Sequence, residues 1–324
     1  MTTAIVQRSN LIGAGCAIAA VLCFSITDVG VKLLSDQYAL HQVVLIRAMI
    51  GALVFLAVIM PFNGGLLVFR TRRPGVHLAR GLCVVMANTF LFLGLASLPI
   101  ADAVAVFFVS PLIITVFSVI ILHEKVGPRR WMAIALGFIG VLVIIKPGTT
   151  AFQLASLFPI AAAFLYAVIH ILARKAGNTE SAATMTAYMI LTFLIVSSVI
   201  GLVMGDGRFA GQQAGPGGGT FDFLLRAWGP VERADYPVLL MLGLSGVSGG
   251  WFVSQAYRLS EAAFAAPFEY IAMPMAVIWG ITVFDTWPDT LAWFGIALII
   301  GSGLYLLWRE QVKGRAAAAP KVRQ

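Results

Sequence analysis

The chain has 324 residues, of which 60% are hydrophobic and 11% are charged, and its formal net charge is +8. A soluble domain carries about 25% charged residues because its surface faces water, so this composition excludes a soluble fold and predicts an all-α integral membrane protein. The basic residues lie between apolar segments and not along one face, which favours positive-inside membrane topology over a nucleic-acid interface.

Ten apolar segments approach the roughly 20 residues that a helix needs to cross a bilayer core of about 30 Å. They are 11–34, 41–60, 76–97, 101–122, 129–146, 152–173, 184–204, 237–257, 262–284 and 288–308. The first segment is too long for a signal peptide and lacks a cleavage site, so we interpret it as the first spanning helix. The sequence therefore predicts ten transmembrane helices.

The long connection 205–236 contains Gly215-Pro216-Gly217-Gly218-Gly219 and seven charged residues. We expect a flexible external loop there, with a short interfacial helix around 221–228. With the N-terminus inside, 16 Lys and Arg residues fall on the cytoplasmic side and five on the other. This bias predicts a multi-pass protein of the plasma (inner) membrane with both termini cytoplasmic, including the tail 309–324.

An internal repeat relates the two halves of the chain. A shift of 161 residues places Leu98 on Leu259 and Phe107 on Phe268. A weaker sequence match between the two halves occurs at a shift of 142 residues. We expect two five-helix repeats, 11–146 and 152–308. Because five is odd, the second repeat is inverted relative to the first, which is the architecture of many secondary transporters.

Three charged residues near the outer ends of helices 1 and 2 are candidates for a substrate or coupling site, because charges inside a membrane are costly. Asp28 and Lys32 lie four residues apart on one helix face, and Arg47 reaches a similar depth in the second segment. Two interpretations stay open. Asp28 forms a structural ion pair with Arg47 or Lys32, or the three form an outer gate or a site for a zwitterionic or carboxylated solute.

The ninth segment carries two prolines, Pro267 and Pro274, which bracket Glu269 and Tyr270. A proline frees a helix carbonyl, which a membrane tolerates only where something else satisfies it. We expect a broken helix whose buried carboxylate binds a cationic solute or a proton. The alternative is that Glu269 simply pairs with Arg80 or Arg258. Pro111 lies near the repeat-equivalent position and predicts a matching kink.

Five further polar or aromatic residues are weaker candidates, since each is equally suited to lining a cavity or joining helices. They are Asn88, Tyr166, His170, Trp251 and Gln255. Cys16, Cys23 and Cys83 lie in apolar stretches without metal-ligand spacing, and we predict neither a metal site nor a cofactor.

Several loose motifs in a fixed order resemble the drug/metabolite transporter superfamily, in its ten-helix form with two EamA-type repeats. In the first half they are Arg47, Arg80-Gly81, Leu95-Ala96-Ser97-Leu98-Pro99, and the Glu124 turn before Trp131–Val143. In the second half, Pro267-Phe268-Glu269-Tyr270 and Phe284-Asp285-Thr286-Trp287-Pro288-Asp289 are similar to the branch that includes S-adenosylmethionine carriers. The resemblance covers about residues 11–308 and implies a secondary carrier that works by alternating access around a cavity among helices 1, 3, 4, 6, 8 and 9.

The main functional hypothesis is therefore a proton-coupled or exchanging transporter of a small organic metabolite. An exporter of amino acids, toxic compounds or drugs is the alternative within transport. A membrane-embedded enzyme or sensor is a distant second class, because no catalytic constellation or P-loop occurs. The expected partners are the lipid bilayer and a small-molecule substrate. Small-residue faces on helices 5 and 10 allow a monomer or a homodimer.

Overall fold

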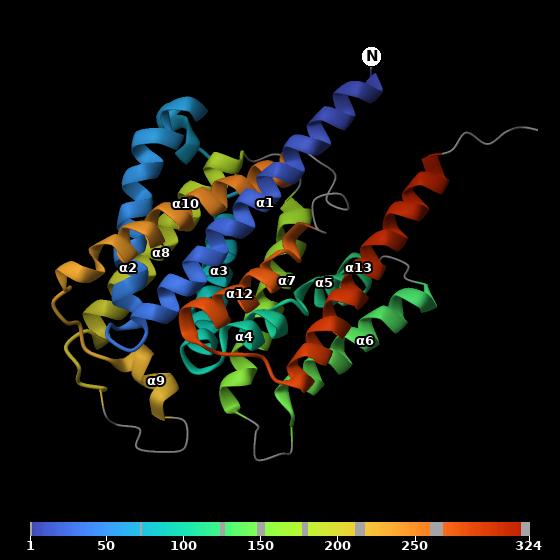
Figure 1. Ribbon diagram of the computed structural model, residues 1–324. Helices are drawn as coiled ribbons and strands as arrows, with labels where there is room; N and C mark the ends of the chain where they lie inside the picture. Colours follow the sequence, from blue (N-terminus) through green and yellow to red (C-terminus); the bar gives the residue numbers. More distant parts are fainter. Residues whose placement is uncertain are drawn as a thin grey trace, which may run out of the picture.

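The structure is a computed structural model that describes residues 2–71, 73–123, 127–147, 153–176, 181–210, 218–259 and 268–318. All regular structure in these ranges is helical, which confirms the all-α prediction (Figure 1). The longer helices are α1 (Thr2–Leu34), α2 (Leu40–Val54), α3 (Pro74–Ser97), α4 (Ile100–Phe107), α5 (Ser110–Leu122), α6 (Pro128–Ile145), α7 (Leu157–Ala176), α8 (Ala182–Met204), α9 (Gly218–Leu225), α10 (Tyr236–Leu259), α12 (Ala272–Phe284) and α13 (Thr290–Ala318). The short turns are a π-helix, η1 (Phe55–Ile59), and four 3₁₀ helices, η2 (Pro61–Asn63), η3 (Gly65–Phe69), η4 (Leu154–Ser156) and η5 (Arg233–Asp235).

Local sequence sets several helix ends. Helices α3 and α6 each begin at a proline, Pro74 and Pro128, where the missing N–H costs nothing and the fixed φ suits a first turn. Helix α8 begins after Ser181, whose side chain accepts a hydrogen bond from the Thr184 amide. Helix α6 ends at Ile145, and the next residue, Lys146, adopts a left-handed conformation with φ 52°.

Within the described ranges, six helical stretches are long and apolar enough to cross a membrane, namely Ile12–Leu34, Leu40–Ile59, Pro74–Ser97, Ile100–Ile121, Ala183–Met204 and Arg233–Val253. Four shorter apolar stretches are Trp131–Ile145, Leu154–Ile169, Ala272–Phe284 and Thr290–Tyr305. Each of these stretches overlaps a different one of the segments expected from the sequence. The number of helices that cross the membrane stays a prediction.

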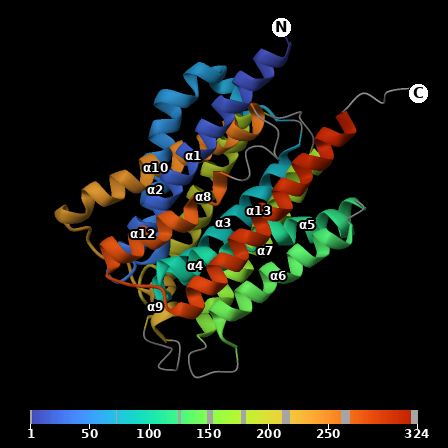
Figure 2. The ribbon, with the colours of Figure 1, turned by 45° about the vertical axis from the view of Figure 1, so that its right-hand side comes forward.

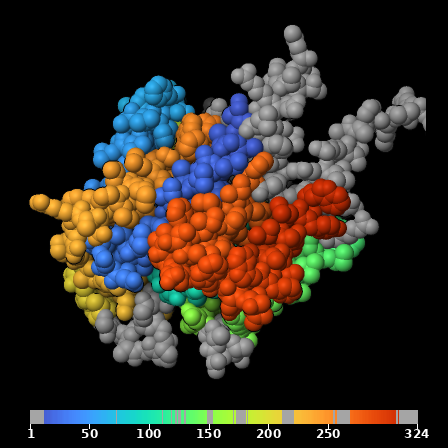
Figure 3. All heavy atoms as spheres, in the orientation of Figure 1, coloured from blue at the N-terminus to red at the C-terminus, as the bar shows by residue number. Residues whose placement is uncertain are grey.

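The start of α1 and the end of α13 lie at the same end of the bundle (Figures 1 and 2). Large apolar side chains cover much of the outer surface; for example, Leu202 is 82% exposed and Leu53 67% exposed. Helices α1, α10, α12 and α13 together form the face of the molecule seen in Figure 3. An apolar surface of this extent suits a protein whose surroundings are lipid.

The helices pack in pairs that are distant in sequence. Helix α1 packs on α10, α3 on α7 and α8, α2 on α8 and α10, α4 on α12, and α6 on α13. The α6–α13 contact, visible along one side of Figure 2, is very close at Gly140 and Gly295. A Cβ at Gly140 would lie 2.9 Å from the carbonyl oxygen of Gly295, and one at Gly295 would lie 2.8 Å from that of Gly140. Small residues on these two helices thus serve contact within the chain.

Residues 218–235, which we call the strap, include a short helix that overlaps the one expected at 221–228, and the segment is packed against the bundle. The strap contains α9, which packs on α2 and α3, and its Phe223 is only 1% exposed. The glycines and charges of this connection indicated a loop, but the burial of one phenylalanine in a preformed groove holds the segment in place. Residues 211–217, which include most of the Gly-rich run, lie outside the described ranges.

Candidate functional site

The fourth apolar segment is broken in its middle. Helix α4 ends at Phe107, residues Phe108 and Val109 form a turn, and α5 begins at Ser110. The residue after Ser110 is Pro111, which has no N–H to donate to the carbonyl of Phe107. A continuous α-helix through this point would leave that carbonyl without its usual partner, so the break coincides with the proline.

The ninth segment has a similar break. Helical residues Phe268 and Glu269 lead into a turn at Tyr270 and Ile271, and α12 begins at Ala272. Pro274 cannot donate to the carbonyl of Tyr270, which instead accepts a hydrogen bond of 3.1 Å from the amide of Met273. Pro267, the other proline expected to break this helix, lies outside the described residues.

The two breaks face each other across the α4–α12 contact. The ring centroids of Phe108 and Tyr270 are 5.6 Å apart. The neighbouring Phe107 lies edge-on to Tyr166 of α7, with centroids 5.3 Å apart. Two interrupted helices and α7 therefore meet at one aromatic contact in the interior.

Charged groups gather around this contact. Tyr166 lies near Glu269, beside the break in the ninth segment, and near Arg80 on α3. We call the residues that meet here the central cluster: Arg80, Phe107, Phe108, Tyr166, Glu269 and Tyr270. Ionisable side chains inside a membrane protein mark a functional site by default, and here they lie beside interrupted helices.

Tyr270 is buried with an unsatisfied hydroxyl. Its side chain is 6% exposed, and its Oη has no hydrogen-bond partner among the described residues. The ring lies against α13, where a Cβ at Gly303 would come within 1.8 Å of that hydroxyl oxygen. A buried hydroxyl without a partner costs about 1–3 kcal/mol, so a structure that retains one has a reason beyond packing.

Glu269 is half-buried, and among the described residues no ion pair joins it to Arg80. The Nε of Arg80 is itself buried without a hydrogen-bond partner in the part of the chain described. The side chain of Arg258, the other partner considered for Glu269, lies outside the described set. The simple Glu269–Arg80 ion pair thus has no support in the structure.

Arg47 lies in an aromatic enclosure apart from the central cluster. Its guanidinium carbon is 5.3 Å from the ring centroid of Phe92 and 5.1 Å from that of Phe193. Asp28 interacts with it electrostatically, although no ion pair within 4.0 Å joins these two described residues. Cation–π contacts of this kind stabilise a desolvated guanidinium by about 2 kcal/mol, which gives Arg47 a packing role between α2, α3 and α8.

Lys32 caps the end of α3. Its Nζ donates hydrogen bonds of 2.6 Å to the carbonyl oxygens of both Leu95 and Leu98 and lies 5.4 Å from the ring centroid of Phe284. The last carbonyls of a helix lack intrahelical partners and carry partial negative charge, so an ammonium group satisfies both needs. The Lys32 amine therefore bonds to backbone oxygens. The four-residue spacing from Asp28, which suggested an ion pair, did not predict these contacts.

The weaker candidates are dispersed. Asn88 donates to the carbonyl of Val84 in its own helix, Trp251 packs edge-on against Phe252, and Gln255 is half-buried on α10. The side chain of His170 lies outside the described set. Within the described part of the chain, no hydrogen bond, ion pair or ring contact joins these three side chains to the central cluster.

Sequence reasoning missed two polar links between helices. The Trp279 indole donates to Ser25 Oγ at 2.5 Å and joins α12 to α1. Thr27 and Ser245 share a hydrogen bond of 2.8 Å that joins α1 to α10. Single Ser, Thr and Trp residues in apolar segments carry no signal of which distant partner they meet.

The strap closes one end of the bundle through a polar network. The Tyr38 hydroxyl, between α1 and α2, donates to Asp235 at 2.5 Å and accepts from the Glu232 amide at 3.1 Å. Arg226 donates to the carbonyls of Ser35 and Tyr38 at 2.9 and 3.2 Å.

Two further contacts hold the strap to the start of α2. Gln42 pairs reciprocally with the backbone of Gly229, donating at 2.7 Å and accepting at 3.2 Å. The Trp228 ring stacks on His41 with centroids 5.8 Å apart. The strap is therefore bonded at several points to the α1–α2 turn.

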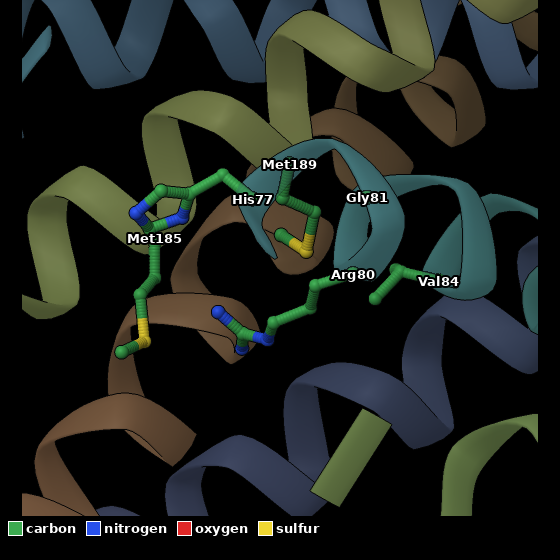
Figure 4. Close-up of a pocket in the computed structure, with 6 residues that line it drawn as sticks. All are labelled: His77, Arg80, Gly81, Val84, Met185 and Met189. Atoms are coloured by element: carbon green, nitrogen blue, oxygen red, sulfur yellow. The ribbon is translucent and has the colours of Figure 1, made fainter. Parts of the chain in front are cut away.

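A small pocket of about 10 Å³ lies near the opposite ends of these helices, between the first turns of α3 and α8 (Figure 4). It is lined by His77, Arg80, Gly81, Val84, Met185 and Met189. Arg80 thus belongs both to this pocket and to the central cluster. No group of three or more His, Cys, Asp or Glu that suits a metal ion occurs among the described residues.

Comparison with known proteins gives similarity over almost the whole chain. Residues 11–146 match the EamA-like transporter family. The chain is 30% identical over 314 residues to a riboflavin transporter of Vibrio cholerae, across 96% of this chain and 97% of that one. It is 27% identical over 287 residues to an S-adenosylmethionine uptake transporter of Rickettsia prowazekii, across 89% of each chain. A solved crystal structure shares the fold with a TM-score of 0.62 and 16% identity, over 97% of this chain and 99% of that one.

Proposed function

This chain belongs to the EamA-like transporter family of the drug/metabolite transporter superfamily, and from this premise we infer that it is a secondary active transporter working by alternating access. It is a multi-pass membrane transporter of a small molecule and not an enzyme. We place it in the plasma (inner) membrane with both termini cytoplasmic. Lys and Arg favour the side assigned to the cytoplasm by 16 to 5, and α1 begins at the same end of the bundle at which α13 ends. Both observations support that orientation.

The contacts between helices support two inverted repeats. In that arrangement α1, α2, α3, α4–α5 and α6 correspond to α7, α8, α10, α12 and α13. Exchanging the halves then turns the α1–α10 contact into α7–α3, α2–α10 into α8–α3, and α5–α7 into α12–α1, all of which occur. The pairs α2–α8, α4–α12 and α6–α13 map onto themselves and also occur.

The observation that carries the proposal is the central cluster, where the breaks at Phe108 and Tyr270 face each other. Transporters with inverted repeats bind substrate near the midplane, where discontinuous helices from the two repeats expose backbone groups. Here a carboxylate, Glu269, and a buried hydroxyl, that of Tyr270, lie beside the breaks. We propose that the substrate binds at this cluster and that Glu269 takes part in substrate or proton binding.

The strap and Lys32 lie at the end that this orientation places outside the cell. Their hydrogen bonds to the α1–α2 turn and to the end of α3 favour a state closed on the outer side. Alternating access then requires these bonds to break when the outer side opens. The proposed substrate is a metabolite of the kind carried by the two named relatives, riboflavin or S-adenosylmethionine, and the proposed direction is uptake.

Uptake by the purified protein in proteoliposomes tests this proposal. Labelled riboflavin and labelled S-adenosylmethionine are offered separately, with a proton gradient, with internal unlabelled compound, or with neither. Saturable uptake of one compound above that of empty liposomes supports the proposal. Acceleration by the gradient indicates proton coupling, and acceleration by internal compound indicates exchange. The absence of uptake for both compounds under all conditions would reject both substrates.

A further inference from the structure

The pocket between α3 and α8 has a polar end and an apolar side. Arg80 provides the guanidinium, while Val84, Met185 and Met189 provide apolar surface. Figure 4 shows the Arg80 head group and the Met185 thioether extending into the same region. At the rim, His77 stacks on Tyr188 with centroids 4.8 Å apart and an angle of 17° between the ring planes.

Arg80 has bonding capacity that the described residues do not use. Its Nε is buried and without a hydrogen-bond partner among them, and the ion pairs that they form do not include it. A guanidinium carries five N–H donors in a fixed plane, and a buried donor without an acceptor is costly. A protein keeps such a group when a ligand supplies the missing acceptor at some stage of its work.

The shape of a guanidinium selects its ligand. Its planar fork matches the two oxygens of a carboxylate or phosphate, which it binds through two parallel hydrogen bonds. The pocket has a cavity volume of about 10 Å³, close to the room that one water needs, whereas sites that enclose a whole small molecule have roughly 300–1,000 Å³. It therefore holds one end of a ligand. The two methionines favour an aromatic or other flat apolar part beside the anionic group.

We propose that the Arg80 pocket binds a carboxylate or similar two-oxygen anionic group of the transported molecule, while the rest of that molecule extends toward Tyr166 and the helix breaks. This inference rests on the proposed transport function and adds a substrate class, molecules with an anionic end. Of the two compounds proposed above, S-adenosylmethionine has such a carboxylate and riboflavin does not. Tyr166, which lies near both Arg80 and Glu269, connects the pocket to the central cluster.

A binding experiment on the whole chain tests the pocket independently of transport. The protein is placed in nanodiscs of phosphatidylcholine, and its thermal unfolding is measured against sodium benzoate and against benzamide, which has the same ring but no anionic charge. Benzoate should stabilise the wild type and benzamide should not. In Arg80→Gln the apparent affinity for benzoate should fall at least about tenfold, because a charge-assisted bidentate contact is lost. An equal response of Arg80→Gln and wild type, or an equal response to both compounds, overturns the proposal.

Two variants separate the pocket from its surroundings. Arg73→Gln removes an exposed positive charge just before α3 and should leave benzoate binding unchanged. Arg80→Lys keeps the charge but not the fork, so its affinity should lie between those of wild type and Arg80→Gln. If Arg80→Gln does not fold, Arg80→Lys carries the test, and wild-type affinity in that variant overturns the bidentate contact.

An anionic lipid headgroup has the same chemistry as an anionic substrate. Nanodiscs that also contain phosphatidylglycerol distinguish the two sources. Unchanged benzoate binding in them supports a substrate site, whereas abolition of binding by the anionic lipid assigns the pocket to a headgroup and overturns the proposal.

Benzoate binding without metabolite transport would reject the proposed substrates alone. Transport that Arg80→Gln leaves intact would reject the pocket alone.

Discussion

The ring of Phe108, at the break in the fourth apolar segment, lies 5.6 Å from the ring of Tyr270, at the break in the ninth. These residues are at nearly equivalent positions of the two proposed repeats, since a shift of 161 residues places Val109 on Tyr270. The contact joins the points where both helices lose their regular hydrogen bonding. It makes the position of Tyr270 the feature on which the proposed site depends.

The fit of Tyr270 against α13 predicts the effect of adding one methyl group there. A Cβ at Gly303 would come within 1.8 Å of the tyrosine hydroxyl, so Gly303→Ala must displace the ring. We expect a loss of about 1–3 kcal/mol in unfolding free energy, as for other overpacked interiors. Reduced uptake of the transported metabolite should accompany it. Thermal unfolding in detergent measures the first effect.

Gly301, two residues earlier on α13, is the matched control. A Cβ at Gly301 would meet nothing within 4 Å, so Gly301→Ala should be neutral or slightly stabilising through its higher helix propensity. Equal stability of the two alanine variants would show that Tyr270 does not occupy the position described.

The contacts of Lys32 predict a role in closing the end of α3. Lys32→Met removes the donor to the carbonyls of Leu95 and Leu98, with an expected cost of about 1–3 kcal/mol. Chemical or thermal unfolding of the purified variant gives the value. A double-mutant cycle with Asp28→Asn should show a coupling energy within about 0.5 kcal/mol of zero. Strong coupling would instead support the ion pair that the spacing of the two residues suggested.

The strap should depend on Arg226 for its attachment. Arg226→Ala removes the hydrogen bonds to Ser35 and Tyr38, and amide hydrogen exchange over residues 218–235 should become faster because the segment opens more often. Arg208→Ala is the comparison, since Arg208 is exposed and contacts Asp206 in the same connection. Similar exchange rates in both variants would argue against an attached strap.

The hydrogen bonds of the Asp289 carboxylate predict that the stability of the protein depends on pH. Its carboxylate accepts a hydrogen bond from Lys146 and another from the Ala292 amide at 2.7 Å, and the first of these in particular lowers its pKa below 3.8. A carboxylate with a lowered pKa in the folded state contributes stability above the unfolded value, and that contribution disappears as the pH falls through the folded value.

Asp289→Asn isolates the charge, because asparagine also caps a helix N-terminus. We expect the variant to be less stable than wild type by less than about 1 kcal/mol at pH 7, since the Asp289 side chain is 56% exposed and screened by solvent. The difference should shrink below pH 3.8. Unfolding curves between pH 7 and pH 2 measure it. A difference that grows on acidification would contradict this role for Lys146.

The sequence alone was enough for the fold class and the family, because both rest on features that local rules describe. Apolar length identifies the helices, and prolines such as Pro111 and Pro274 mark where a helix cannot continue. The motifs around Arg80 and Glu269 supported the family resemblance without any knowledge of their contacts.

Such local rules could not predict the contacts between helices that are distant in sequence. Arg47 is enclosed by Phe92 and Phe193, which are about a hundred residues apart in sequence. The charged residues near it in sequence suggested an ion pair or a gate or solute site, and not this enclosure. Lys32 binds backbone carbonyls, which carry no sequence signature. The short helix expected near 221–228 overlaps α9, but its attachment to the bundle could not be predicted, because the burial of Phe223 depends on a surface formed by α2 and α3.

The most direct test of the proposed site compares two carboxylate substitutions in the proteoliposome assay. Glu269→Gln removes the charge in the central cluster, and Asp285→Asn removes an exposed one at the end of α12, where φ of 50° suits asparagine. With whichever of riboflavin or S-adenosylmethionine the wild type carries, uptake by Glu269→Gln should fall at least about tenfold, equivalent to one lost charged contact, while Asp285→Asn should stay near wild type. Wild-type uptake by a folded Glu269→Gln variant would contradict the placement of the site at the helix breaks.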